Sequence, residues 1–516
     1  MITELQIVSL ATYLLVALGA SVLYYFVLLI RQNANIRKYG GRRVHMIYGN
    51  PLTAIPWTRW VMKNAARNTI LEMYEKLYGS LPPGSMHAYE LQSTPGYRSI
   101  ETREPAHIKA VLAGQFTDFG KGPTFHEIWS PFLGDSIFTT DGKMWQNSRA
   151  LIRPMFLTDR ISDLHIFERY INKLIAHIPP SGQTVEIMDL FFRMTLDVTT
   201  DFLLGASVNS LDNPHNEFTR AFNDILRHQL KFQILKKITP FDKFVSRAEY
   251  NRHIKTIEDF ITPFIRQTLS LPPEELEKLT KSDKSFTFLH KLAQFTQDPK
   301  VIRDQLIAVL LAGRDTTAAT LSWAFYELAA CPDKVARLRA EVLEVVGKRE
   351  APTYETLKNM KYLRYTLQET LRMHPAVPLN TREALVDTTL PGVNGHPDIG
   401  ICKGDNVSYS PLVLHRRRDL YPPVSENFAD PNSFSPERWY HWQPRPWEYI
   451  PFNGGPRICP GQNFALTEMG YCMVRMLQKF DRLEYRGDWH AQREQTDVIT
   501  RPSLGVPVAL FEASDV

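Results

Sequence analysis

Cysteine is scarce in this chain of 516 residues, which contains only four: Cys331, Cys402, Cys459 and Cys472. No two of them have the C-x-x-C spacing of zinc or redox sites, and none lies in a cluster with histidines. So few cysteines in so long a chain do not make a disulfide framework. The composition therefore suits a reducing compartment, in which a single thiolate can serve as a metal ligand.

Dense runs of one charge are also missing. Lys and Arg number 60 against 55 Asp and Glu, which gives a net charge of +5 and no basic run of the density that nucleic-acid binding requires. We therefore expect no nucleic-acid partner. The sequence has no internal repeat, no low-complexity tract and no G-x-G-x-x-G fingerprint after a strand, so it has no nicotinamide- or flavin-binding domain of its own. With 44% hydrophobic and 22% charged residues, the remainder reads as an ordinary globular chain.

The N-terminus is the exception, because no charged residue occurs from Leu5 to Ile30. A membrane-spanning helix needs about 20 apolar residues. Basic residues follow at once, and this asymmetry predicts that the bulk of the chain lies in the cytosol. A cleaved signal peptide is the first alternative, but the run is longer than a usual signal core and no basic segment precedes it. An apolar core helix is the second, and the basic residues that follow argue against it; these are Arg31, Arg37, Lys38, Arg42 and Arg43.

The rest of the chain reads as mainly α with small β-sheets. We predict a transmembrane anchor over 5–30, a hinge or linker over 31–60 and one large catalytic unit over 61–516. Apolar residues at three- and four-residue steps predict helices, and a β-compatible stretch beside a turn predicts a strand at 97–102. The expected helices include 105–112, 189–204, 216–237, 300–331 and 461–480.

The segment 452–461 reads FNGGPRICPG and carries the strongest local signal. A thiolate that binds iron must be deprotonated, shielded from oxidation and close to donors or a helix N-terminus. Cys459 lies just before a predicted helix, Phe452 offers an aromatic shield, and Arg457 offers a cation for a carboxylate of the cofactor. A lone cysteine beside a glycine turn is usually a structural residue, but this combination favours a metal ligand. Three glycines let the backbone approach a flat cofactor closely; they are Gly454, Gly455 and Gly461.

The segment 308–323 reads AVLLAGRDTTAATLSW and places a glycine and two charges within a long apolar helix. Gly313 costs about 1 kcal/mol against alanine there, which suggests a packing or functional reason. Asp315 and Thr316 put an acid beside a hydroxyl, a pair that can pass protons to an oxygen ligand. The alternatives are a threonine bonded to its own helix, a surface aspartate and tight helix packing. The residues that share one face of this helix are Val309, Ala312, Gly313, Thr316 and Thr320.

Glu369 and Arg372 lie three residues apart, on one face of a helix that ends before Pro375. From the residues alone, the pair can be an ordinary surface salt bridge worth about 0–1 kcal/mol. His374 and His415 each lack a second ligand at a useful spacing, and we interpret both as structural.

The cysteine segment follows the haem-loop pattern F-x-x-G-x-R-x-C-x-G throughout and resembles the cytochrome P450 family. Other segments resemble this family's motifs in the same order: 145–149 is similar to W-x-x-x-R, 312–317 to A-G-x-D/E-T, 369–372 to E-x-x-R, and 436–439 to the partner segment of E-x-x-R. The resemblance covers essentially the whole body of the chain. It implies the cytochrome P450 fold over 61–516 and haem b as the cofactor.

The resemblance also implies residue roles. Cys459 would be the proximal iron ligand, because a thiolate pushes electron density onto the iron and favours O–O cleavage. Thr316 and Asp315 would deliver protons. Glu369, Arg372 and Arg438 would form a structural network that fixes the proximal side of the haem. The other residues implied to bind the cofactor are Trp145, Arg149, Arg382, Phe452, Gly455, Arg457 and Gly461, with propionate partners foreseen in Trp145, Arg149, Arg382 and Arg457.

The implied reaction is insertion of one oxygen atom from O2 into a C–H bond. Electrons would come from NADPH through a separate cytochrome P450 reductase at the cytosolic face of the endoplasmic reticulum membrane. The segments 117–122, 454–459 and 466–468 look most like the fungal branch that hydroxylates n-alkanes and fatty acids. A fatty chain, a terpenoid and a polyketide of secondary metabolism remain open as the apolar substrate. The predicted roof of its pocket is apolar: Phe119, Phe125, Ile128, Trp129 and Phe132.

Two other functions are compatible with a haem-thiolate chain. One is an isomerase or dehydratase that needs neither O2 nor NADPH, against which the intact Asp315-Thr316 pair argues. The other is a non-catalytic haem sensor or membrane scaffold, which would have no use for that pair.

Overall fold

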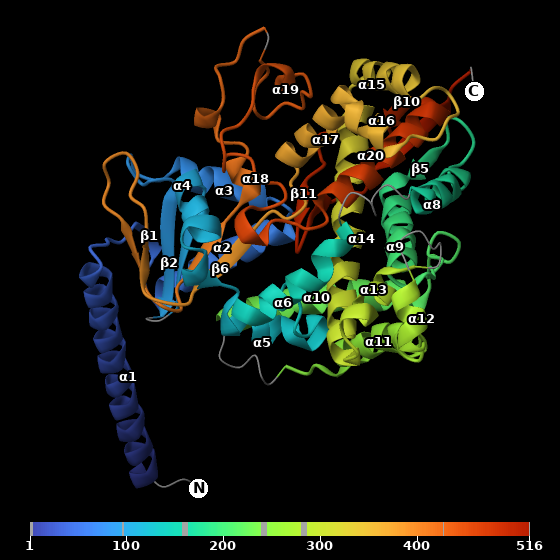
Figure 1. Ribbon diagram of the computed structural model, residues 1–516. Helices are drawn as coiled ribbons and strands as arrows, with labels where there is room; N and C mark the ends of the chain where they lie inside the picture. The colour runs from blue at the N-terminus through green and yellow to red at the C-terminus, as the bar shows by residue number, and fades with distance from the viewer. Residues whose placement is uncertain are drawn as a thin grey trace.

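The computed structural model describes residues 4–94, 97–156, 164–238, 245–279, 286–426 and 428–514. Helices make up most of the body, and short strands form small sheets at its edges (Figure 1). The helices are α1 Glu4–Lys38, α2 Pro51–Ala66, α3 Ile70–Gly79, α4 Pro105–Lys109, α5 Gly122–Leu133, α6 Gly142–Ile152, α8 His165–Ala176, α9 Ile187–Leu204, α10 Glu217–Ile238, α11 Ala248–Leu269, α12 Pro273–Lys278, α13 Phe288–Phe295, α14 Pro299–Ala329, α15 Pro332–Val345, α16 Tyr354–Asn359, α17 Lys361–Met373, α18 Pro411–Leu414, α19 Arg438–His441 and α20 Gln462–Lys479. The strands are β1 His45–Tyr48, β2 Ala88–Thr94, β3 Tyr97–Thr102, β4 Phe119–Gly120, β5 Thr184–Glu186, β6 Asn380–Ala384, β7 Thr388–Leu390, β8 Ile399–Ile401, β9 Asn406–Tyr409, β10 Phe480–Tyr485, β11 Glu494–Thr496, β12 Thr500–Pro502 and β13 Pro507–Glu512.

The longest helix of the body, α14, organises the core. The Asp298 side chain caps it by accepting the Lys300 backbone N–H at 2.8 Å, and Pro299 occupies its first turn. Its N-terminal half contributes Leu306 and Leu310 to one apolar cluster, with residues of α9, α10, α11 and α13. Its C-terminal half contributes Leu321 to a second cluster, with residues of α17 and α20. The two clusters therefore meet near the middle of α14, where the sequence places its polar segment.

The largest sheet among the described residues has the strand order β1-β2-β3-β9-β6-β4. Most neighbours pair antiparallel, whereas β1 with β2 and β3 with β9 are parallel. Antiparallel pairing sets Gly120 of β4 opposite Glu383 of β6. This register brings the start of α5 beside Arg382, although more than 250 residues separate them along the chain.

The structure agrees with most of the predicted elements. The predicted strand at 97–102 is β3, and the predicted helices at 189–204, 216–237, 300–331 and 461–480 correspond to α9, α10, α14 and α20. The predicted helix at 105–112 differs, because α4 ends at Lys109 and a π-helical turn, η1, covers Ala110–Gly114. This turn presents the Leu112 carbonyl to the cysteine loop, a contact between distant segments that sequence spacing does not reveal.

The N-terminal helix α1 continues beyond Ile30 to Lys38, and Figure 1 shows it leaving the body as a single long rod. Its segment Leu15–Lys38 is long and apolar enough to cross a membrane, with a mean hydropathy of 1.7 and 6% of the window buried. The predicted hinge at 31–60 is therefore largely ordered, as the end of α1, β1 and α2. Ile36 explains part of this difference, because its side chain packs so closely on Gly400 that a Cβ there would lie 2.7 Å away.

Candidate functional site

The cysteine loop has one fixed backbone point, at Gly455. This residue has φ +63°, and a Cβ on it would lie 1.9 Å from the Leu112 carbonyl oxygen, so no other residue fits there. Gly455–Arg457 then form a single 3₁₀ turn, η6, and the Cys459 backbone N–H donates to the Phe452 carbonyl at 3.0 Å. Gly461 is under no such constraint, because a Cβ there would meet Phe156 at an ordinary 3.6 Å. Packing against the protein therefore requires glycine at 455 and not at 461, and the close approach of this backbone to a flat cofactor stays a prediction.

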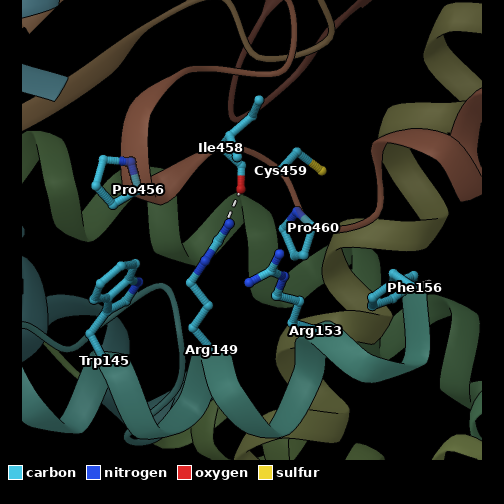
Figure 2. Close-up of a pocket in the computed structure, with 8 residues that line it drawn as sticks. All are labelled: Trp145, Arg149, Arg153, Phe156, Pro456, Ile458, Cys459 and Pro460. Carbon is cyan, nitrogen blue, oxygen red and sulfur yellow. Dashed lines mark hydrogen bonds between the residues drawn. The ribbon is translucent and has the colours of Figure 1, made fainter. Parts of the chain in front are cut away.

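Cys459 is partly exposed, and it faces a cavity of about 410 Å³. Figure 2 shows α6 running beneath the cysteine loop, with Arg149 of α6 and Arg153 just after it pointing up at the loop. The lining residues are Trp145, Arg149, Arg153, Phe156, Pro456, Ile458, Cys459 and Pro460.

Two groups favour negative charge on the sulfur. Burial raises the pKa of the Cys459 thiol, while the Gly461 backbone N–H and the Arg149 guanidinium lower it. Arg149 donates from Nη1 to the Ile458 carbonyl at 3.0 Å, as Figure 2 shows. The assignment of Arg149 to a propionate stays a prediction, and in the structure its guanidinium reaches the peptide next to the cysteine. In this position its charge acts on the thiolate.

The middle of α14 has a small solvent-accessible surface. From Asp304 to Ala329 the helix is fully buried except at 311–313 and at Thr316. Ala312, Gly313 and Thr316 belong to the face of small residues predicted from the sequence. Accessible side chains in the middle of a core helix must border a hollow. Gly313 has a second role, because a Cβ there would lie 2.9 Å from Thr199 Oγ1 of α9, so tight helix packing also requires the glycine.

Asp315 and Thr316 differ in their surroundings. Thr316 donates from Oγ1 to the Ala312 carbonyl at 2.7 Å, which is the bond within the helix that the sequence left open as an alternative. Asp315 is 3% exposed, and its Oδ1 has no hydrogen-bond partner among the described residues, although Arg314 Nη1 lies 3.3 Å away. Burial raises the pKa of the Asp315 carboxyl, and Arg314 and Arg501 lower it. The acid is thus buried and not a surface charge.

Cations gather where the cysteine loop meets β6. Arg457 pairs with Asp141 at 2.5 Å, donates to the Thr140 carbonyl at 2.9 Å and lies 4.6 Å from the Trp145 ring. Burial and the neighbouring Arg382 lower the pKa of Arg457 to about 10. Arg382 is 3% exposed, and within the described residues it forms no ion pair.

This arrangement fits the anionic edge of haem b. A buried guanidinium without a carboxylate costs several kcal/mol unless an anion completes the site. Arg457 Nε is likewise buried without a hydrogen-bond partner among the described residues. Together with the partly exposed Cys459 and the face of small residues on α14, these unmatched donors suit a flat cofactor that carries two carboxylates.

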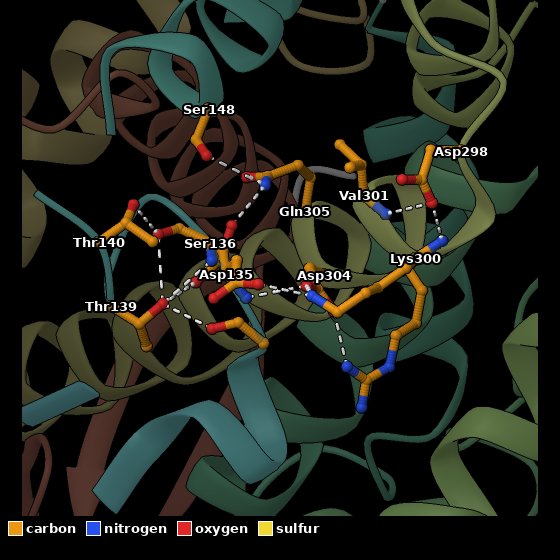
Figure 3. Close-up of polar contacts among 12 residues, drawn as sticks. Asp135, Ser136, Thr139, Thr140, Ser148, Asp298, Lys300, Val301, Asp304 and Gln305 are labelled. Atoms are coloured by element: carbon orange, nitrogen blue, oxygen red, sulfur yellow. Dashed lines mark hydrogen bonds and ion pairs between the residues drawn. The ribbon is translucent and has the colours of Figure 1, made fainter. Parts of the chain in front are cut away.

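The loop 135–140 is fixed to the start of α14, as Figure 3 shows. Asp304 accepts the Asp135 backbone N–H at 2.8 Å and pairs with Lys300 at 2.9 Å. Gln305 reaches Ser148 of α6 at 3.2 Å. The network therefore holds α6, α14 and the Asp141 carboxylate in one register, which positions Arg457.

Glu369, Arg372 and Arg438 come together with at most 1% exposure. Arg372 Nε donates to Glu369 Oε2 at 2.8 Å, and Arg438 Nε lies 3.3 Å from Glu369 Oε1. Trp439 Nε1 adds a third donor at 3.0 Å. Burial excludes the alternative of a surface salt bridge, and loss of one partner would leave a buried charge unmatched.

His374 and His415 bind protein groups. The His374 ring lies between Glu327 at 2.8 Å and Glu494 at 2.9 Å, and His415 Nε2 accepts the Ile450 backbone N–H at 2.9 Å. Across the described part of the chain there is no group of three or more His, Cys, Asp or Glu that could hold a metal ion. Both histidines are structural, as predicted.

Part of the predicted pocket roof is core instead. Phe119 is 2% exposed and packs in the apolar cluster of the sheet, because β4 places it there. Phe132 is fully buried against Phe222 of α10, with ring centroids 6.0 Å apart. Phe125 stacks on Trp129 at 5.6 Å and stays partly accessible, so it can still face a ligand.

Asp141 and Lys121 are site residues that the sequence did not single out. Asp141 accepts the backbone N–H groups of Lys121 at 2.8 Å and Gly122 at 2.9 Å while it pairs with Arg457. The only hint in the sequence is the place of Asp141, just before the helix that carries Trp145 and Arg149.

Comparisons with known proteins agree with this geometry. A family model described as Cytochrome P450 matches residues 92–507. The chain is 47% identical to cytochrome P450 monooxygenase pvhE of Talaromyces variabilis, over 81% of each chain. It is 39% identical to cytochrome P450 52A1 of Candida tropicalis, over 82% of this chain and 78% of the relative. The crystal structure of cytochrome P450DA heme domain has the same fold, with a TM-score of 0.73 at 21% identity over 92% of this chain and 98% of the other.

Proposed function

The chain belongs to the cytochrome P450 family, and we propose that it inserts one oxygen atom into a C–H bond of an apolar, membrane-delivered molecule at the site built around Cys459. It is an oxygen-incorporating oxidoreductase that uses haem b. The observation that carries the proposal is a partly exposed Cys459 in a chain whose core helix α14 has a small accessible face that bears Thr316.

Bound haem supplies the iron at which O2 is activated. In the proposed assignment the Cys459 thiolate holds the iron, and Arg149 and the Gly461 N–H stabilise the negative charge on sulfur. Glu369, Arg372 and Arg438 fix the loops around the cysteine segment.

Proton delivery is assigned to Asp315 and Thr316. Burial favours the protonated form of the Asp315 carboxyl, so this side chain can carry a proton into an apolar interior. The Thr316 hydroxyl donates to Ala312, and its free lone pairs can accept a proton before the hydroxyl rotates to pass it on. The apolar side chains around α5 exclude bulk water from this path.

The substrate, electron donor and location are proposed from several features together. The resemblance of 117–122, 454–459 and 466–468 to the fungal alkane and fatty-acid hydroxylases supports a long-chain alkane or fatty acid, and a terpenoid or polyketide of secondary metabolism is the second candidate. The chain has no nicotinamide fingerprint, which supports an NADPH–cytochrome P450 reductase as the partner. The apolar helix and the basic residues after it support an endoplasmic reticulum location with the body in the cytosol.

The test is product formation by the full chain in lipid vesicles with reductase, NADPH and isotopically heavy O2. We expect a hydroxylated alkane or fatty-acid product that carries one heavy oxygen atom. A rearranged or dehydrated product that forms without NADPH would instead establish the isomerase or dehydratase alternative.

Two threonine variants separate proton delivery from packing. Thr316→Ala should lower the product formed per NADPH at least about tenfold, since a positioned proton donor contributes that much or more. Thr317→Ala removes a buried hydroxyl from the next position, off the accessible face, and should retain coupling. Equal loss in both variants would contradict the assignment of Thr316.

A further inference from the structure

A second cavity, of about 390 Å³, lies apart from the cysteine loop. It is bordered by the start of α3, the C-terminal end of α14, the end of α17 and the segment that leads into β11. Among the residues that the structure describes, none lines both this cavity and the one that Cys459 faces. The proposed reaction assigns this second cavity no role.

Aromatic rings form one wall of the second cavity. Trp489 stacks on Tyr326 of α14 with ring centroids 3.8 Å apart, and Trp323 stacks on His374 at 3.9 Å. Trp323 and Tyr326 meet edge to face at 5.5 Å, so the four rings make one continuous wall. Trp489 lines the cavity and is partly exposed. The face of an indole ring attracts a cation, and a flat cation can lie parallel to it.

Two carboxylates lie beside these rings, and one of their oxygens lacks a donor. The ring nitrogens of His374 contact Glu327 Oε1 at 2.8 Å and Glu494 Oε1 at 2.9 Å. Arg416 also donates to Glu494 Oε1, at 2.9 Å. Glu494 is 7% exposed, and its Oε2 has no hydrogen-bond partner among the described residues. A buried acceptor without a donor is costly, so a ligand that supplies the donor gains binding free energy.

The arginines around the cavity direct their donors elsewhere. Arg493 pairs with Glu72 at 3.5 Å and donates to the Gln492 carbonyl at 2.7 Å. Arg416 uses its other terminal nitrogen on the Leu412 carbonyl, at 3.2 Å. Three carboxylates border the cavity, so an anionic ligand would be repelled. The lining therefore favours a positively charged ligand that carries N–H donors.

We propose that this cavity binds a small, flat organic cation of the amidinium or guanidinium type, with its N–H groups on Glu494 and its plane against Trp489. Such a cation presents paired donors in one plane, which match a carboxylate better than a compact ammonium does. The proposal does not depend on the haem reaction, because the two cavities have no lining residue in common among the described residues.

Isothermal titration of the purified full-length holoenzyme with benzamidinium tests the site. Benzamide is the matched probe, because it has nearly the same shape and no charge. We expect saturable binding of one benzamidinium per chain, and binding of benzamide at least about tenfold weaker, as expected for loss of a charge-assisted contact. The Soret band of the haem should stay in place throughout. A Soret shift that follows the heat of binding would locate the probe at the haem and overturn the proposal.

Two variants test the position of the probe. Glu494→Gln removes the carboxylate and should weaken the binding of benzamidinium at least about tenfold. Trp489→Leu removes the accessible ring and should weaken it about fivefold. Glu355→Gln removes an exposed acid of α16 and should bind the probe as the parent does.

Haem content and the CO-bound spectrum show whether each variant is folded. If Glu494→Gln is not folded, Trp489→Leu decides the question by itself, because Trp489 lies at the accessible side of the wall. Binding by Trp489→Leu within twofold of the parent, or no saturable binding by the parent, would overturn the proposal. Neither result would touch the proposed function, which fails only with the haem-thiolate spectrum or the oxygenated product.

Discussion

Gly455 shows how one residue fixes the site. Its positive φ costs an L-residue about 1–2 kcal/mol, and the Leu112 carbonyl oxygen lies where a Cβ would be. The first cost is common to many glycines of this chain, whereas the second is specific to the cysteine loop. This close approach holds η6 against η1 and so fixes where the loop that carries Cys459 lies relative to η1.

This contact predicts a large effect of Gly455→Ala on cofactor content. We expect most of the haem to be lost, because the loop must move to relieve the clash. Gly395→Ala is the control, since Gly395 has φ +80° and no atom within 4 Å of a Cβ. Haem content per protein, measured after purification, should fall only for Gly455. Equal haem contents in the two variants would contradict the steric account.

Glu468 of α20 is a buried acid with no assigned role. It is 1% exposed, and neither carboxylate oxygen has a hydrogen-bond partner among the described residues. Burial raises the pKa of this carboxyl well above 4.5. Because the folded chain holds the proton more tightly than the unfolded chain, stability falls as the pH rises from the unfolded pKa toward the folded pKa.

Glu468→Gln should remove this pH dependence, because the amide is neutral at every pH. The variant should gain stability over the parent by up to about 1.4 kcal/mol per pH unit above pH 4.5. The measurement is the thermal midpoint of both proteins from pH 5 to about pH 8, with exposed Glu355→Gln as the control. Parallel curves for parent and Glu468→Gln would contradict a protonated Glu468.

The sequence predicted individual residues best where a motif joins them. Cys459, Gly455 and Arg457 are neighbours along the chain, so their spacing carries the information. Arg149 stays a predicted propionate partner, and its contact with the Ile458 carbonyl was not foreseen, because sequence spacing does not show how close the cysteine loop lies to α6. Lys121 was missed because its neighbours come from β6 and the cysteine loop.

At the scale of elements, α1 is joined firmly to the body. Arg43 donates to Asn33 at 2.8 Å and to Gln32 at 3.0 Å at the end of α1, and it also pairs with Glu90 of β2. Glu90 is fully buried and holds Arg98 as well, at 2.7 Å. This polar cluster lies within the predicted hinge and joins the end of α1 to the sheet.

Arg43→Met should therefore loosen the anchor. Loss of a partner from a buried charge cluster costs about 3–5 kcal/mol, and residues 31–44 should gain amide exchange at least tenfold. Arg42→Met is the matched control, because Arg42 is the neighbouring residue and is exposed. Hydrogen exchange in lipid nanodiscs measures both. Exchange within twofold of the parent in Arg43→Met would show that α1 is held in another way.

Element boundaries were predictable where local chemistry sets them. Asp298 and Pro299 start α14, and Pro332 opens the next helix, so both ends follow from the sequence. The π-helical turn after α4 was not predictable, because the cysteine loop imposes it. The end of α1 was missed for the same reason: distant residues of the sheet bind it.

At the scale of the whole molecule, α14 divides the core into two apolar clusters, and the site lies where they meet. Both apolar clusters pack against α14 but leave 311–313 and Thr316 accessible to solvent. A helix in the core of a protein is usually buried on every side, so α14 is an exception at these positions. The polar network around Asp304 then holds α6 and the cations in register with this gap. The mainly helical fold was predictable from periodicity and motif order, whereas this convergence required the tertiary structure.

The most direct test of the account is the absorption spectrum of the reduced, CO-bound protein, recorded for the parent and for Cys459→Ser. We predict a thiolate-type Soret band in the parent and its loss in Cys459→Ser, with Cys472→Ser, which alters a buried cysteine of α20, retaining it. A parent without that band, or a Cys459→Ser variant that keeps it, would contradict the assignment of Cys459 as the iron ligand.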